Sequence, residues 1–99
     1  MKKSVVVSER QTGQVEVDIP AIPDWEGFDK LCQFLINEYS AAIVSSVDGP
    51  GVRKCILHVK GQSIELRYEE PYGSSIHSIE SNATEIIRII GKDLADRLK

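Results

Sequence analysis

One segment of the chain gathers carboxylates, hydroxyls and an imidazole within nine residues, from Glu69 to His77. A serine nucleophile needs a base within hydrogen-bond reach and a third group that orients the base. Ser75 and His77 are two positions apart, so on a strand they would share one face. The segment has no nucleophile-elbow pattern and no signature of oxyanion donors. We interpret it as a polar loop rich in turn-forming residues, and a small enzyme that uses Ser75, His77 or Glu70 is the less favoured alternative.

The case for a metal or redox centre is weak. A His/Glu/His site would need both histidines of the chain, His58 and His77, on one sheet face beside Glu65. Cys32 and Cys55 form neither a CxxC pair nor a Cys/His cluster of zinc spacing. We expect two reduced, buried thiols rather than a disulfide, and we expect no metal or cofactor.

Acidic residues are concentrated in the first half of the chain. Residues 1–50 carry four Lys and Arg against eight Asp and Glu, whereas residues 51–99 carry eight against seven. Four of these eight acidic residues of the first half belong to one expected helix: Asp24, Glu26, Asp29 and Glu38. Such a surface can steer a basic partner, although an ordinary solvated helix face has the same composition. The net charge of −3 argues against a dedicated nucleic-acid binder, which needs an excess of cations.

Length and composition predict a single domain, residues 1–99, with a substantial core, because 41% of the residues are hydrophobic. Two lysines follow Met1, and three valines follow Ser4. This apolar run is shorter than the roughly seven or more apolar residues of a signal peptide core. No stretch approaches the roughly 20 apolar residues of a membrane helix. We therefore expect a cytoplasmic protein that does not contact a membrane.

Three strands are expected in the first half. Ser4 to Arg10 and Gln14 to Ile19 should pair around a turn at Gln11–Gly13. The second of these alternates apolar and acidic residues, which is typical of a half-buried strand. Ala41 to Val47 is an apolar strand that ends in the turn Asp48–Gly51.

A hairpin in the second half is the clearest feature. Val52 to Lys60 and Ser63 to Glu69 would pair around a two-residue turn at Gly61–Gln62. One face then matches apolar or aromatic residues: Val59 with Ile64, Leu57 with Leu66 and Cys55 with Tyr68. The other face would match His58 with Glu65, Ile56 with Arg67 and Lys54 with Glu69. A less regular strand, Ser74 to Glu80, follows.

Two amphipathic helices complete the pattern, Asp24 to Tyr39 and Asn82 to Leu98. Asp24 can cap the first helix, and Asn82 with Glu85 resembles a capping box for the second. The apolar stripe of the first helix is Trp25, Phe28, Leu31, Cys32, Leu35 and Tyr39. The apolar stripe of the second is Ala83, Ile86, Ile87, Ile90, Leu94 and Leu98.

Three large apolar residues remain outside this packing. Phe34 and Ile89 lie off the two helix stripes, and Tyr72 lies in a loop. Single exposed apolar residues are common. Two of them on separate helices could instead mark a dimer or a partner contact, because contact patches favour aromatic residues.

The element order ββ-α-ββββ-α defines the expected fold class. Tight turns between consecutive strands indicate a mainly antiparallel sheet, and two amphipathic helices suit one face of it. The result is an α+β, two-layer sandwich. The other sheet face would be solvated, with Glu16, Asp18, Lys54, His58, Glu65, Arg67 and Glu69.

Two short motifs carry a family resemblance. Pro23-Asp24-Trp25-Glu26-Gly27-Phe28 at the start of the first helix, and the stretch from Leu66 to Ser74 with its Tyr-acidic-acidic-Pro-Tyr-Gly-Ser turn, resemble small uncharacterised bacterial domains. The resemblance covers roughly residues 20–75. In plan, the chain is also similar to the small acidic immunity proteins that neutralise polymorphic bacterial toxins. That resemblance implies an inhibitor that binds a protein, and it assigns no role to individual residues.

We therefore predict a non-enzymatic interaction protein of the bacterial cytoplasm, in its sharpest form an immunity-type inhibitor with a basic protein partner. A homodimeric assembly module, joined through a sheet edge or through the apolar residues outside the stripes, is the alternative. The expected contact residues lie on the first helix and in the loop after the hairpin: Asp24, Glu26, Asp29, Phe34, Glu38, Glu69, Glu70 and Tyr72.

Overall fold

The computed structural model describes residues 5–9, 15–22, 24–70, 72–79 and 83–98. Its elements follow the expected order: β1 (Val6–Glu9), β2 (Val15–Ile19), α1 (Trp25–Tyr39), β3 (Ala42–Gly49), β4 (Val52–Val59), β5 (Gln62–Glu69), β6 (Gly73–Ser78) and α2 (Thr84–Arg97). The turn expected at Gln11–Gly13 lies outside the described residues.

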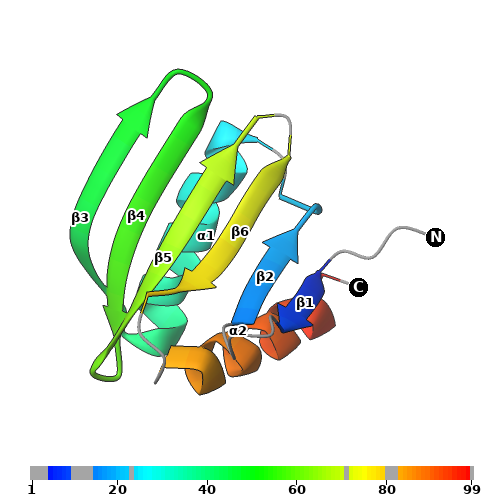
Figure 1. The fold of residues 1–99 in the computed structure, drawn as a ribbon, viewed down its shortest axis with the longest axis vertical. Coiled ribbons are helices and arrows are strands. Elements are labelled where there is room, and N and C mark those ends of the chain that lie inside the picture. Colours follow the sequence, from blue (N-terminus) through cyan, green and yellow to red (C-terminus); the bar gives the residue numbers. More distant parts are fainter. Residues whose placement is uncertain (1–4, 10–14, 23, 71, 80–82, 99) are drawn as a thin grey trace.

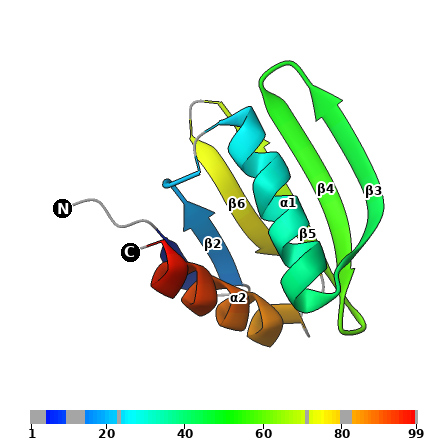
Figure 2. The ribbon, with the colours of Figure 1, turned by 180° about the vertical axis from the view of Figure 1, so that it is seen from behind.

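The strands form one antiparallel sheet in the order β1-β2-β6-β5-β4-β3 (Figure 1). Strands β3 to β6 follow one another as a meander, and the β1–β2 hairpin joins the meander through β2 and β6. Figure 2 shows both helices on the same face of this sheet. The expected two-layer α+β sandwich is confirmed.

The core lies between the sheet and the two helices. Alternate residues of the strands point into it, as the period-two patterns predict. Its fully buried members include Val15, Val17, Ile19, Leu57, Val59, Ile64, Leu66, Ile76, Leu35, Ile87 and Ile90. Most of the expected helix stripes are therefore confirmed, with Trp25 as an exception described below.

Helix α1 begins where the sequence predicts. Asp24 is the N-cap, and its Oδ1 accepts a hydrogen bond of 2.6 Å from the Gly27 amide. A Cβ on Gly27 would lie 2.6 Å from that same oxygen, so glycine is required for the close approach. Helix α2 differs from expectation, because its N-cap is Ala83, which makes no side-chain cap hydrogen bond. The expected cap, Asn82, lies outside the described residues.

The β4–β5 hairpin has the expected faces but a different register. Its turn is formed by Lys60 and Gly61, whose φ angles are 50° and 80°. Two consecutive left-handed residues are typical of a type I′ turn, whose twist suits a hairpin. The pairing is thereby shifted by two residues, so that Leu57 lies opposite Ile64 and Cys55 opposite Leu66. A shift of two keeps every side chain on its face, which is why the predicted core residues are still buried.

The shift changes the pairs on the outer face. His58 lies opposite Ser63 rather than Glu65, and Lys54 lies opposite Arg67 rather than Glu69. Glu65 instead faces Ile56 on β4 and His77 on β6. The expected pair of His58 with Glu65 is therefore wrong.

Candidate functional site

Three chain segments that carry carboxylates meet at one end of the molecule. They are the first turns of α1, the β3–β4 turn and the β5–β6 turn, all at the top of Figure 1. We call this surface the acidic end and define it by Asp24, Trp25, Glu26, Asp29, Asp48, Glu69, Glu70 and Tyr72. Five of the expected contact carboxylates, together with Tyr72, belong to it.

Arg53 on β4 holds two of these segments together. Its guanidinium lies 2.8 Å from Asp29 on α1 and 3.1 Å from Asp48 on β3, and it donates a hydrogen bond of 3.2 Å to the Trp25 carbonyl. It also stacks over the rings of Trp25, at 4.4 Å, and of Phe28, at 4.8 Å. Burial alone would lower the pKa of Arg53, but hydrogen bonds with Asp48 and Asp29 outweigh it and raise that pKa.

The β5–β6 turn is tied to the β3–β4 turn. The Glu70 amide donates to the Gly51 carbonyl at 2.9 Å, and the Tyr68 hydroxyl donates to Glu70 Oε1 at 3.3 Å. Burial and the Glu70 carboxylate raise the pKa of Tyr68. The ring of Tyr68 packs edge-on against Trp25, with centroids 6.1 Å apart. The acidic end is thus one connected structure rather than three independent loops.

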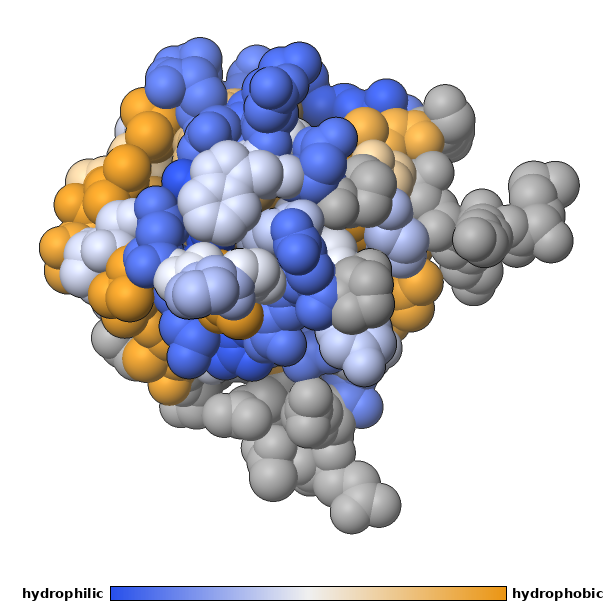
Figure 3. Space-filling model, turned by 90° about the horizontal axis from the view of Figure 1, so that it is seen from above, coloured by the Kyte–Doolittle hydropathy of each residue, from blue (hydrophilic) through white to orange (hydrophobic). Residues whose placement is uncertain are grey.

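Two aromatic side chains are exposed among these carboxylates. Tyr72 is 81% exposed, as the sequence predicts for a loop aromatic. Trp25 is 40% exposed, so its expected place in the buried stripe is wrong. The reason is its position in the first turn of α1, where the indole packs on Arg53 and against Tyr68 and its remaining surface reaches solvent. Seen from this end, the surface is mostly hydrophilic, with apolar residues gathered at the margin on the β3 side (Figure 3).

The other two expected contact residues lie at the opposite end of α1. Glu38 is 3.9 Å from Arg97 on α2. Phe34 is partly buried, which contradicts the expectation that it is left outside the packing. The reason is the approach of α2, whose Arg97 guanidinium lies 4.9 Å over the Phe34 ring. Phe34 lines a groove of about 310 Å³ between the helices. Ile89 on α2 is 48% exposed, as predicted.

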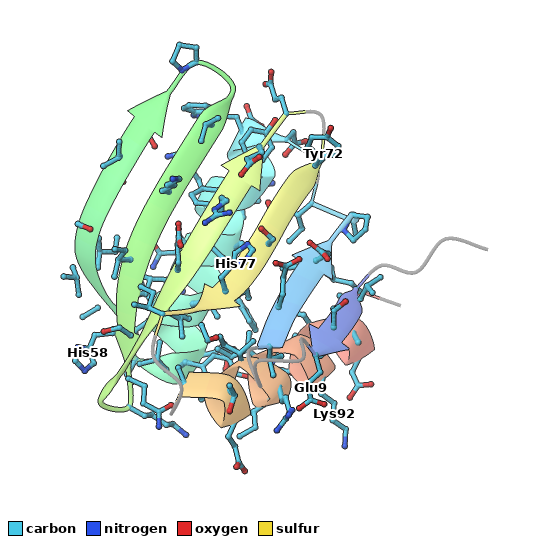
Figure 4. The ribbon with its side chains drawn as sticks, viewed as in Figure 1. Glu9, His58, Tyr72, His77 and Lys92 are labelled. Atoms are coloured by element: carbon cyan, nitrogen blue, oxygen red, sulfur yellow. The ribbon has the colours of Figure 1, made fainter. Side chains whose placement is uncertain are left out.

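A second cluster of polar side chains lies on the outer face of the sheet. Ser75 Oγ is 2.8 Å from His77 Nε2, and His77 Nδ1 is 3.0 Å from Glu16 Oε1 on β2 (Figure 4). These residues line a shallow depression of about 200 Å³. Burial lowers the pKa of His77 although Glu16 opposes it, so the imidazole is neutral near pH 7. The remaining charges around the ring are Asp18, Glu65 and Arg67.

This geometry supplies a hydroxyl, a base and a carboxylate that orients the base. The sequence predicts that Ser75 and His77 share a face, but it does not identify Glu16 as the third group. Acyl transfer also needs donors for an oxyanion. Strand β6 lies between β2 and β5 and pairs with both, so its backbone amides beside Ser75 are engaged in the sheet. The absence of enzymatic activity stays a prediction.

The histidines and cysteines lie in separate places. His77 is in the middle of the sheet, whereas His58 points away from the lower end of β4 in Figure 4. Among the described residues, no group of three His, Cys, Asp or Glu is arranged to hold a metal ion. Cys32 and Cys55 are free thiols that contact each other between α1 and β4, and burial raises the pKa of Cys32 to about 12.

Arg53, Asp48 and Trp25 are not among the residues that the sequence predicts for the site. A signal for Arg53 exists, because it alternates with Cys55, Leu57 and Val59 on the face that packs against the helices. A cation in that pattern indicates a partner for acidic residues on α1. The sequence gives no comparable signal that Glu16 contacts His77, because β2, which carries Glu16, pairs with β6, a strand distant in sequence.

None of the helices in the described part of the chain is both long enough and apolar enough to span a membrane. Comparisons of the chain with protein-family models, with curated proteins and with solved structures find no match.

Proposed function

We propose that this chain is a non-enzymatic protein-binding domain of the bacterial cytoplasm, and that it holds a basic protein partner at the acidic end, as an immunity-type inhibitor does. The observation that carries the proposal is the meeting of the α1 carboxylates with the Glu69–Tyr72 loop at one end of the molecule. Sequence separates these two groups by about half the chain, and the fold gives them one surface.

The charges at this end are of two kinds. Asp29 and Asp48 form ion pairs with Arg53, and these ion pairs stabilise the structure of the acidic end. Glu26 and Glu70 are exposed; Glu26 lies in the first turn of α1, and Glu70 also accepts the hydrogen bond from the Tyr68 hydroxyl. Exposed carboxylates around a rigid frame attract a basic partner over distances comparable to the Debye length, which is about 8 Å at physiological salt. They raise the association rate more than they slow dissociation.

Trp25 and Tyr72 supply the second element of a binding surface. Aromatic side chains surrounded by charge carry much of the energy of typical protein interfaces, and loss of an anchor often weakens binding by about 2 kcal/mol or more, roughly thirtyfold. Trp25 is already held in place by Arg53 and Tyr68, so binding would not have to order it. Tyr72 is the more exposed of the two and is the better target for mutation.

Affinity capture from the source cells with charge-matched variants tests the proposal. The acidic-end variant is Glu26→Lys with Glu70→Lys, and the control is Glu38→Lys with Glu85→Lys, which changes the net charge equally at distant exposed positions. Each form is captured side by side, and bound proteins are quantified by mass spectrometry at low and at moderate salt. We expect a basic protein that the wild type and the control retain and the acidic-end variant loses.

Two results would contradict the proposal. If the variant and the control retain the same protein equally, the acidic end is not the contact. If the control alone loses it, the contact lies at Glu38 or Glu85 and not at the acidic end. Thermal unfolding of all forms shows whether each variant is folded, and Tyr72→Ala then measures the aromatic contribution with the purified partner.

A further inference from the structure

The two edges of the sheet are protected to very different degrees. Among the described residues, strand β1 forms one edge with four residues, and its Glu9 is paired with Arg88 of α2. Helix α2 also packs on this side, since Gly91 lies against Val7. Short length, charge and a covering helix are common protections of an edge strand. Strand β3 forms the opposite edge with eight residues and lies beyond α1 in Figure 2.

Strand β3 exposes apolar side chains along its length. Ile43 is 53%, Val44 62% and Val47 67% exposed. Ile43 lies opposite buried Leu57, on the helix side, whereas Val47 lies opposite Lys54, on the outer side. The strand is therefore apolar on both faces, and it has a bulge at Val44, between the pairs of Ile43 and Ser45. An edge strand of this length and composition is a template for pairing with another strand.

The charge along this edge is compatible with a second copy of the same chain. From Ala41 to Val47 there is no ionisable side chain, and the next residue, Asp48, is paired with Arg53. Each chain carries a net charge of −3, so two copies repel each other at most approaches. At β3 they meet across apolar residues and serines. Antiparallel pairing about a two-fold axis places the same uncharged surface on each copy.

We propose that β3 pairs antiparallel with β3 of a second copy and joins the two sheets into one. With Ser46 on the two-fold axis, Ser45 lies opposite the partner copy's Val47, and both are on the outer face. The two Val47 side chains are then diagonal neighbours on the outer face. With this axis the bulge at Val44 restricts regular pairing to Ser45, Ser46 and Val47 of each copy.

The size of this contact predicts a weak dimer. Eight residues of strand extend about 26 Å, and only part of that length pairs. Standard stable interfaces bury about 800 Å² on each partner, which is more than this edge provides. We therefore expect a dissociation constant on the order of 100 µM, so the dimer forms only at high concentration.

Sedimentation velocity and amide exchange test the proposal on the purified chain. The concentration runs from about tenfold below to tenfold above the expected dissociation constant. The variant is Val47→Lys, and the matched control is Val6→Lys on the β1 edge; both valines are exposed in the monomer, so neither change disturbs the core. We expect the wild type and Val6→Lys to dimerise and Val47→Lys to weaken the dimer by about tenfold or more. Amides of β3 should exchange more slowly as concentration rises.

Three outcomes would overturn the proposal: a wild type that stays monomeric throughout, a dimer that Val47→Lys leaves intact, or a dimer whose β3 amides gain no protection. Protection of β3 only in a complex with another protein would assign the edge to that partner instead. None of these results bears on capture of a basic protein at the acidic end, because Glu26 and Glu70 are unchanged throughout.

Discussion

Replacement of Arg53 by methionine should loosen the acidic end and destabilise the whole fold. Methionine keeps most of the length of the arginine stem and removes the guanidinium. The Arg53 side chain is 12% exposed, and its guanidinium joins α1 to the β3–β4 hairpin through Asp29, Asp48 and the Trp25 carbonyl. The substitution therefore removes the polar links and leaves the hydrocarbon packing largely in place.

The magnitude follows from the exposure of each partner. Asp29 and Asp48 are 61% and 44% exposed, so water replaces their lost ion pairs, and each contributes no more than about 0.5 kcal/mol. The hydrogen bond to the Trp25 carbonyl adds about 1 kcal/mol. Stacking on Trp25 and Phe28 adds about 0.5–1 kcal/mol. We expect Arg53→Met to lower the free energy of unfolding by about 2–3 kcal/mol.

Urea unfolding followed by circular dichroism measures this loss, and the fluorescence of Trp25 reports on the acidic end in the same titration. Arg88→Met is the matched control, because Arg88 pairs with Glu9 where both side chains are about half exposed. The control should change stability by less than about 0.5 kcal/mol. If Arg53→Met is no more destabilising than the control, Arg53 does not hold the acidic end together.

Two further predictions concern stability. Because burial lowers the pKa of His77 in the folded chain, the unfolded chain takes up a proton first as the pH falls through about 6.5. On acidification the wild type should therefore lose stability relative to His77→Gln. Urea titrations at pH 7.5 and pH 5.5, about one unit either side of that value, measure the difference. The opposite trend would mean that the pair with Glu16 dominates the pKa of His77. Lys60→Asn should raise the free energy of unfolding by about 0.5–1 kcal/mol, because asparagine tolerates the left-handed conformation and completes an Asn-Gly turn. An unchanged melting temperature would show that lysine causes no strain in this turn.

The order and type of the elements could be predicted because local signals agree. Asp24 caps α1, prolines and glycines separate the strands, and alternation identifies the buried face of each. The hairpin register could not be predicted in the same way. Gly61 indicates a turn, but a left-handed lysine at position 60 has no side-chain signature, and a shift of two residues leaves the apolar pattern unchanged.

In the candidate site, too, the residue types could be predicted from the sequence, but the distances between the residues could not. The sequence identifies Asp24, Glu26 and Glu70 as acidic, but their distance from one another depends on the sheet order, which local patterns do not determine. The same limit applies to Glu16, which reaches His77 only because β2 pairs with β6. The geometry of one helix alone predicts Phe34 at the surface, whereas its partial burial comes from a second helix.

The pairing of β2 with β6 also has a consequence for the order in which the chain acquires its structure. During synthesis β1 and β2 are made before the meander, yet β2 has no strand on its second side until β6 has been made. The β3–β6 meander connects neighbours in sequence, so its loops close at a lower entropic cost. We expect the meander to form first and the β1–β2 pair to dock late, although it is made earlier.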